Sequence, residues 1–182
     1  MSGSVEFSAM FVSELLRVLS EGPLREELLS NASPDLKAMI QSPASKGWWP
    51  SPPMFEFIEA VVSRQGREHL KRLCIQASHN RMGPIARPLV NIFLLVAGAT
   101  PETLFSRAGT FVSIGVRTVV TRWNSTGPKS GTVSFRFPGP VPADLSLLWW
   151  GMLVEGFTIL KNGRVAREDI TPEVHTFDLE WD

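Results

Sequence analysis

Tyrosine is absent from the 182 residues of this chain, although phenylalanine occurs 11 times and tryptophan 6 times. Tyrosine side chains often act as general acids, general bases and ligand anchors, so their absence removes a set of reaction mechanisms. Cysteine occurs only once, which excludes an internal disulfide framework and suits the cytosol.

Neither sign of charge dominates, because Lys+Arg and Asp+Glu both count 18. Nucleic-acid-binding domains usually carry a basic surface, so we expect no nucleic-acid partner. The longest apolar run, residues 89–99, is interrupted by Asn91 and is shorter than the roughly 20 apolar residues that span a bilayer. The N-terminus lacks the basic region of a signal peptide. We therefore expect a cytoplasmic protein without a membrane partner.

Recognised catalytic motifs are also missing. The sequence contains no GxGxxG or GxxxxGK[ST] loop, no GxSxG elbow and no HExxH pair. Apolar residues make up 43% of the chain, which is enough for one core. The length and composition thus predict a single domain, residues 1–182, that is more typical of a non-enzymatic protein than of an enzyme.

Apolar residues recur at helical spacing through the first 110 residues, with proline and glycine between the segments. We divide this part into a helical N-terminal segment, residues 1–42, and a helical half, residues 54–110, separated by a proline-rich break. Helices are predicted at residues 5–20, 24–30, 36–41, 54–65, 67–82, 88–97 and 100–108.

The period then changes from 3.6 to 2 in residues 111–182. Strands are predicted at residues 112–123, 132–137 and 174–181, and a very apolar helix is predicted between Asp144 and Gly163. Residues 164–172 read as a polar connection or a weak edge strand. Helices followed by strands that flank one buried helix indicate an α+β fold with a small antiparallel sheet.

His69, Cys74 and His79 lie in one predicted helix, which invites a metal interpretation. Their spacing is i, i+5, i+10, so each step turns the next side chain by about 140° and the three cannot converge on one ion. We therefore predict no metal site. Cys74 shares an apolar stripe with Leu70 and Leu73, which is typical of an inert core thiol.

Two polar residues interrupt the apolar faces of the C-terminal half. Glu155 either lies on the outer edge of the central helix or faces the core, where it would need a partner such as Arg122 or Arg136. His175 alternates with large apolar residues on the last strand. Together with neighbouring aromatic side chains they form our candidate lining of an apolar ligand pocket: Trp149, Trp150, Glu155, Phe157, Phe135 and His175.

A second candidate site is a surface for a protein partner or for another copy of this chain, as in a dimer. Two tryptophans lie in the proline-rich break, where they either plug the core or anchor a partner. The first helix has a hydrophobic arc wider than one buried face needs. The predicted contact residues are Trp48, Trp49, Phe7, Phe11 and Leu15. Deletion of residues 1–20 should then leave a folded domain that no longer associates.

Four segments carry a resemblance to a known family, in their order and hydrophobic rhythm. They are Phe11-Val-Ser-Glu-Leu-Leu-Arg-Val-Leu19, Met54-Phe-Glu-Phe-Ile58, Leu104-Phe-Ser-Arg-Ala-Gly-Thr-Phe111 and Phe177-Asp-Leu-Glu-Trp181. The chain resembles a myxobacterial paralogous domain family of about this length. That family is similar in layout to haem-based nitric-oxide sensor domains, which implies a ligand-sensing or signalling module.

The nitric-oxide sensors hold haem with a helix histidine and a Tyr-x-Ser-x-Arg motif. A chain without tyrosine cannot contain this motif, so we expect no cofactor; His69 and His79 are haem-ligand candidates only by their place in a helix. The sequence favours a regulatory, signalling or protein-interaction domain. One alternative is a sensor or binder of a small hydrophobic ligand or haem. Another is an enzyme that uses His175 with Glu155 or Cys74.

Overall fold

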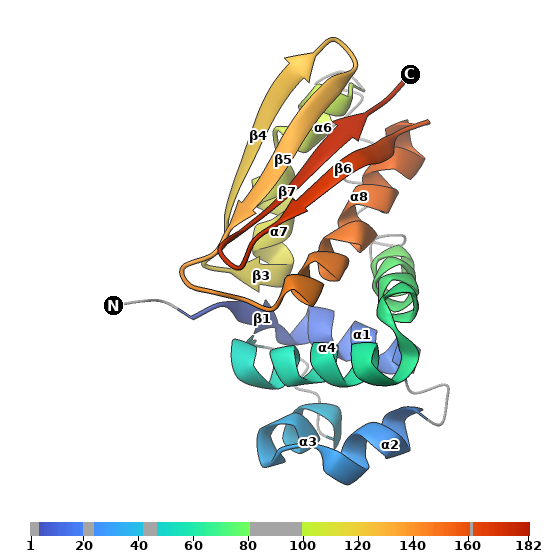
Figure 1. Ribbon diagram of the computed structural model, residues 1–182, viewed down its shortest axis with the longest axis vertical. Coiled ribbons are helices and arrows are strands. Elements are labelled where there is room, and N and C mark those ends of the chain that lie inside the picture. Colours follow the sequence, from blue (N-terminus) through green and yellow to red (C-terminus); the bar gives the residue numbers. More distant parts are fainter. Residues whose placement is uncertain (1–3, 20–23, 42–46, 81–99, 161) are drawn as a thin grey trace.

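The computed structural model describes residues 4–19, 24–41, 47–80, 100–160 and 162–182. Helices form one half of the molecule, and an antiparallel sheet with a helix packed against it forms the other half (Figure 1). The predicted α+β fold is therefore confirmed. The helix predicted at residues 88–97 lies outside the described residues.

The N-terminal half is built from short helices, and several of their ends carry the proline and glycine signals that the sequence shows. Proline stands in the first turn of α4, and Gly66, at a φ of 82°, ends it by donating its N–H to the Val62 carbonyl. A further helix covers residues 67–80. The helices before it are α1 (Ala9–Leu19), α2 (Leu24–Asn31), α3 (Pro34–Gln41) and α4 (Ser51–Gln65).

The helix predicted at residues 5–20 starts later than expected, because its first part is a strand. β1 (Glu6–Ser8) pairs antiparallel with β2 (Trp48–Pro50) on one side and with β3 (Val116–Arg117) on the other. Both partners are distant in the sequence, so local periodicity could not indicate them. The sheet ties the start of the chain to the proline-rich segment and to the C-terminal half.

The strand predicted at residues 112–123 is wrong over its first part. Those residues belong to α7 (Ala108–Gly115), which buries Ala108 and Val112 one turn apart, and β4 begins only at Val120. β-branched residues are compatible with both structures, and tertiary packing overrides their β propensity here. The short helix before it, α6 (Pro101–Phe105), is capped as predicted, since Thr100 Oγ1 accepts from the Thr103 N–H at 3.1 Å.

The larger sheet has four strands in the order β4-β5-β7-β6. β6 is an edge strand, which decides between the two predictions made for that segment. One face alternates into the core, with Val133, Phe135 and Phe177 fully buried. The strands are β4 (Val120–Gly127), β5 (Ser130–Arg136), β6 (Arg164–Ile170) and β7 (Val174–Glu180).

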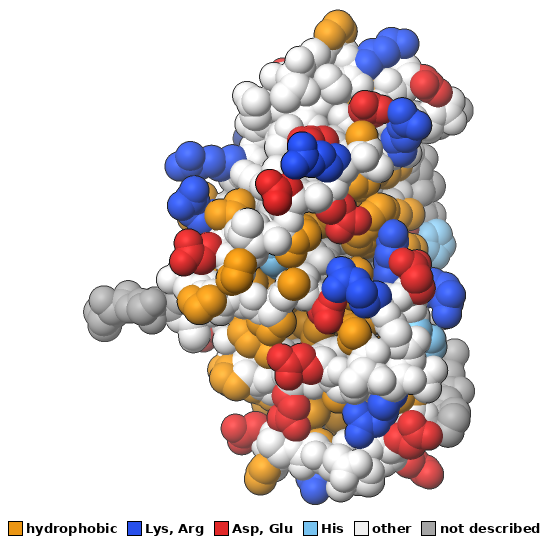
Figure 2. Space-filling model, viewed as in Figure 1, with side chains coloured by type: hydrophobic (Ala, Val, Ile, Leu, Met, Phe, Trp, Pro, Cys, Tyr) orange, Lys and Arg blue, Asp and Glu red, His pale blue; other side chains and the backbone are white. Residues whose placement is uncertain are grey.

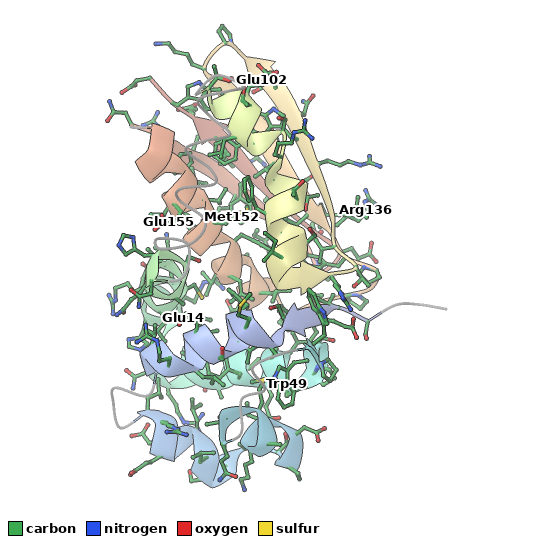
Figure 3. All side chains as sticks on the ribbon, turned by 180° about the vertical axis from the view of Figure 1, so that it is seen from behind. Glu14, Trp49, Glu102, Arg136, Met152 and Glu155 are labelled. Carbon is green, nitrogen blue, oxygen red and sulfur yellow. The ribbon has the colours of Figure 1, made fainter. Side chains whose placement is uncertain are left out.

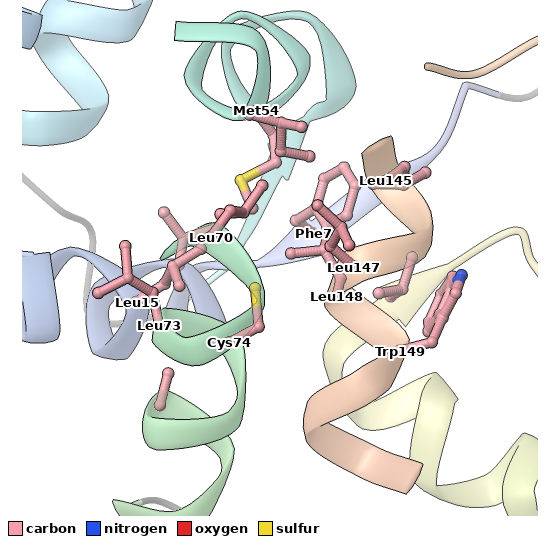
Figure 4. Close-up of a cluster of buried hydrophobic side chains, with 14 of the residues drawn as sticks. Phe7, Leu15, Met54, Leu70, Leu73, Cys74, Leu145, Leu147, Leu148 and Trp149 are labelled. Atoms are coloured by element: carbon pink, nitrogen blue, oxygen red, sulfur yellow. The ribbon is translucent and has the colours of Figure 1, made fainter. Parts of the chain in front are cut away.

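The apolar helix α8 (Leu147–Leu160) follows a short 3-10 turn, η1 (Ala143–Ser146), and lies on the inner face of this sheet. Its first turns also join the cluster of buried side chains around Phe7, Met54 and Leu70 (Figure 4). The core therefore runs from the helical half to the sheet through α8. Among the described residues, no helix is long and apolar enough to cross a membrane.

Candidate functional site

Helix α8 is the element on which the candidate pocket residues meet, because three different parts of the chain contact it. The sheet packs on one side, residues 67–80 on a second and α6 on a third. Ion pairs and aromatic stacks hold its polar and large side chains in fixed positions.

On the sheet side, Trp149 is buried between two strands. Its indole ring stacks on Phe135, with ring centroids 4.2 Å apart and planes 8° from parallel. The same indole lies 6.2 Å from Phe137. Offset stacking of this kind adds to the free energy gained by burial alone, so this side of α8 is rigidly placed.

His175 lies beside Trp149 and is fully buried. Trp149 Nε1 donates to His175 Nδ1 at 3.1 Å. Because an indole N–H can only donate, Nδ1 accepts and the ring proton lies on Nε2. Burial lowers the pKa of His175 from 6.5 to about 4, so the ring is neutral at pH 7. Its Nε2 is buried without a hydrogen-bond partner among the described residues.

On the second side, α8 touches residues 67–80 at Gly151. A methyl group added there would lie 2.6 Å from the Cys74 carbonyl oxygen and 2.1 Å from Ser78 Oγ. Only glycine permits so close an approach of the two helices. The helical half and the sheet half are therefore in direct backbone contact at this point.

One turn further along α8, Glu155 is buried, with 4% of its side chain exposed, and its Oε1 lies 2.8 Å from His79 Nδ1. Of the two alternatives that the sequence left open, the structure therefore has the second, in which Glu155 faces the interior and has a partner. The proposed partners, Arg122 and Arg136, are exposed on the sheet, and Arg136 extends away from Glu155 in Figure 3. Sequence reasoning missed His79 as a partner, because no pattern shows which two helices cross.

Lys71 lies at the other end of the same contact. Its Nζ is 3.2 Å from the centre of the Trp150 ring, a cation–π contact. Arg67, one turn earlier, forms an ion pair with Asp144 just before α8. These pairs lie beside an apolar contact, in which the buried face of residues 67–80 joins the core cluster together with α8.

On the third side, Phe105 of α6 packs against α8 and the sheet. Its ring stacks on Trp123 at 5.4 Å and meets Phe157 edge-on at 5.8 Å. Trp181 lies 6.1 Å from Trp123 and extends this row of rings. Among the predicted pocket residues, Phe157 is thus the one whose ring contacts Phe105 of α6. That they line a pocket for a ligand stays a prediction.

Cys74 is buried among apolar side chains, as Figure 4 shows, and burial raises the pKa of its thiol. A thiol that stays protonated is a poor nucleophile, so this site offers no cysteine chemistry. In the described part of the chain, no three His, Cys, Asp or Glu side chains gather closely enough to bind a metal among themselves.

The residues predicted to contact a partner occupy different environments. Phe7 and Leu15 are buried in the core, so they cannot form an exposed surface. Phe11, Trp48 and Trp49 are half-buried, and Arg117 lies 3.9 Å above the Trp48 ring. On the face shown in Figure 2, acidic and basic side chains are interspersed, in keeping with their equal numbers.

The His79–Glu155 pair has the chemistry of a metal-binding imidazole. A carboxylate oxygen only accepts hydrogen bonds, so His79 Nδ1 donates, and in the neutral ring Nε2 carries the lone pair. Protein imidazoles that bind metals commonly donate their other N–H to a carboxylate in this way. His175 offers the opposite tautomer, with the proton on Nε2, and is enclosed by stacked rings. His79 is therefore the better candidate for holding a cofactor through a metal.

Comparison with solved structures shows the fold of H-NOX proteins. The unliganded Fe(II) H-NOX protein from K. algicida superposes with a TM-score of 0.69, at 11% identity over 96% of each chain. A variant of Tt H-NOX gives a TM-score of 0.57 at 9% identity, over 96% of this chain and 95% of that one. A structure that probes haem distortion in the H-NOX family gives 0.55 at 9%, over 96% and 94%. No family model matches the chain, and no curated protein matches it.

These neighbours correct two expectations from the sequence. The expectation of no cofactor is corrected, because matching structures include two described by their Fe(II) state and two described by their haem. The resemblance to a myxobacterial paralogous family has no match to support it, whereas its likeness in layout to haem nitric-oxide sensors is confirmed along nearly the whole chain. The chain has the H-NOX fold.

Proposed function

We propose that this chain is a sensor domain that binds haem. The observation that carries the proposal is the superposition on the K. algicida H-NOX protein over 96% of both chains. A match of that extent includes both halves of the molecule. It supports a ligand-sensing module better than the protein-interaction domain that the sequence favoured.

The chemistry of His79 supports the same proposal. Its imidazole is 58% exposed and is oriented by the Glu155 carboxylate, so the ring is accessible from solvent. Haem, when bound, would supply an iron that can coordinate a small gas such as nitric oxide. The chain lacks tyrosine, so haem would be held without the Tyr-x-Ser-x-Arg motif of the sensor family.

Aromatic packing favours a second candidate, a small hydrophobic ligand without a metal. Phe157 of α8, Phe105 of α6 and Trp123 of β4 form a row of contacting rings, and ligand pockets are lined mainly by such side chains. This candidate needs the row of rings but does not need His79. The two candidates therefore differ in whether the iron of haem contributes to ligand binding.

The experiment compares haemin with protoporphyrin IX, which has the same ring without iron. We expect the purified protein to bind haemin with a new Soret band and to bind protoporphyrin IX more weakly. Equal binding of both compounds would favour the apolar-ligand candidate. Binding of neither compound, by a protein that melts cooperatively, would exclude haem as the ligand.

A further inference from the structure

The outer face of the four-stranded sheet is turned away from α8, and none of the described helices packs on it. In Figure 1 the sheet lies in front of α6 and α7, with this face toward the reader. Outward side chains alternate with buried ones along each strand, so Thr132, Ser134 and Arg136 of β5 belong to the outer face. An antiparallel sheet can leave one face in water, so exposure alone indicates no partner. The distribution of charge over the face is more informative.

Basic and acidic residues are divided between the two halves of this sheet. β4 and β5 contain arginine but no aspartate or glutamate. β6 and β7 contain all four acidic residues of the sheet and two arginines. One of those arginines, Arg164, is already paired with Glu180 at 2.6 Å. Counted over whole strands, β4 and β5 are therefore positive, and β6 and β7 are negative.

One row of residues across the outer face connects the two halves. The register places Arg122 of β4 opposite Ser134, and Ser134 opposite Thr176 of β7. Asp169 of β6 lies opposite Thr176 and ends the row. Neighbouring strands are about 4.8 Å apart, so Arg122 and Asp169 lie about 14 Å from each other, too far to form a pair. Both are exposed, and neither forms an ion pair with a residue that the structure describes.

We propose that this face is the interface of a homodimer, in which two copies pack sheet against sheet about a two-fold axis parallel to the strands. Such an axis places β4 of each copy over β6 of the other, so that Arg122 faces Asp169 across the interface. The contact occurs twice, because a two-fold interface uses the same patch on both copies. The serine and threonine between the two charges are short, so the sheets can approach to the usual spacing of about 10 Å.

The charge distribution favours a second copy over an unrelated partner. A face of one sign would require a partner of the opposite sign, whereas each half of this face carries the charge that attracts the other half. The sheet measures roughly 19 Å by 24 Å, from its strand spacing and length. That flat area, roughly 450 Å² per copy, is smaller than the roughly 800 Å² of a stable interface. The dimer is therefore weak and sensitive to salt, and it forms whether or not haem is bound.

The test measures the dimer dissociation constant of the full chain by sedimentation velocity. Arg122→Glu and Asp169→Arg each reverse one charge of the proposed contact, and Arg72→Glu is a control at an exposed residue of the helix at 67–80. The two contact variants are measured separately and as an equimolar mixture. In the mixed dimer, both contacts again join an acid to a base. Thermal melting shows that each variant is folded.

We expect the wild type to dimerise with a dissociation constant of about 10 μM to 1 mM, the range of weak complexes. Raising the salt concentration from about 0.1 M to about 1 M shortens the Debye length from about 10 Å to about 3 Å and should weaken the dimer at least about 10-fold. Each contact variant alone should be weaker by at least about 10-fold, because like charges then face each other. The mixture and Arg72→Glu should match the wild type.

A wild-type protein that stays monomeric at about 1 mM would overturn the inference. A dimer that neither contact variant weakens would also overturn it, since that dimer would use another surface, and so would a mixture that fails to regain wild-type affinity. If a charge-reversal variant does not melt cooperatively, Arg122→Gln replaces it. This variant only removes a charge and should weaken the dimer several-fold, and an unchanged dissociation constant would refute the contact.

Discussion

His175 is the clearest case of a single residue whose environment sets its chemistry. The ring is fully buried between the sheet and α8, and Trp149 fixes its tautomer. Burial lowers its pKa from 6.5 to about 4. The folded protein therefore resists protonation of this ring over a pH range in which the unfolded chain accepts a proton.

This difference predicts how stability depends on pH. The contribution of His175 is fully present above pH 6.5 and is lost as the pH falls toward 4, because protons bind preferentially to the unfolded chain. The loss is on the order of 3 kcal/mol. Urea unfolding at pH 7 and pH 4.5, with His175→Gln as the control, measures it. Equal pH dependence in the two proteins would contradict the account.

The sequence predicted the burial of single residues best where that burial depends on the apolar face of one helix or strand. Cys74 shares a stripe with Leu70 and Leu73, and all three are buried as predicted. It was least informative where two distant elements meet. The partner of Glu155 is His79, 76 positions away, and no local pattern distinguishes it from the arginines that were proposed.

Among the elements, the contact of α8 with residues 67–80 is the most sensitive to a small change. Gly151→Ala should lower the free energy of unfolding by about 1–3 kcal/mol, because the new methyl group would overlap Ser78 and the Cys74 carbonyl. Gly139→Ala is the matched control, since no atom lies within 4 Å of the methyl position there. Chemical denaturation measures the free energy of unfolding of both variants. Equal values for Gly151→Ala and Gly139→Ala would contradict a tight contact between the two helices.

The N-terminal strand and α1 belong to the core, so their role differs from the one that the sequence suggested. Phe7→Ala should destabilise the protein by about 3–5 kcal/mol, because Phe7 is fully buried. Met10→Ala, at a residue that is 48% exposed, should have little effect. Thermal melting compares the two, and deletion of residues 1–20 should unfold the domain. A stable Phe7→Ala variant would restore the earlier prediction of a surface role.

The errors in secondary structure have a common physical cause. β1 exists because it pairs with residues 48–50 and 116–117, and α7 exists because it packs one face against the rest of the domain. Both depend on contacts between distant segments, whereas periodicity reports only local pattern. Where local and distant signals agree, as in β5 and β7, the predicted strands match to within two residues.

For the whole molecule, the order of helices, sheet and buried helix could be predicted from composition and periodicity. The likeness to haem sensors followed instead from the resemblance of four segments to a known family. The absence of tyrosine, however, led to the prediction of no cofactor. That reasoning treated one motif as the only way to hold haem. The structure instead presents an imidazole oriented by a buried carboxylate at the contact between the two halves.

The most direct test of the sensor account is the Soret absorbance of the protein titrated with haemin, measured for wild type, His79→Gly and His69→Gly. We predict one haemin per chain for wild type and His69→Gly. His79→Gly should lose the band and regain it when free imidazole is added, because imidazole can occupy the space that the side chain leaves. A wild-type protein that gives no Soret band, or a His79→Gly variant indistinguishable from it, would contradict the account.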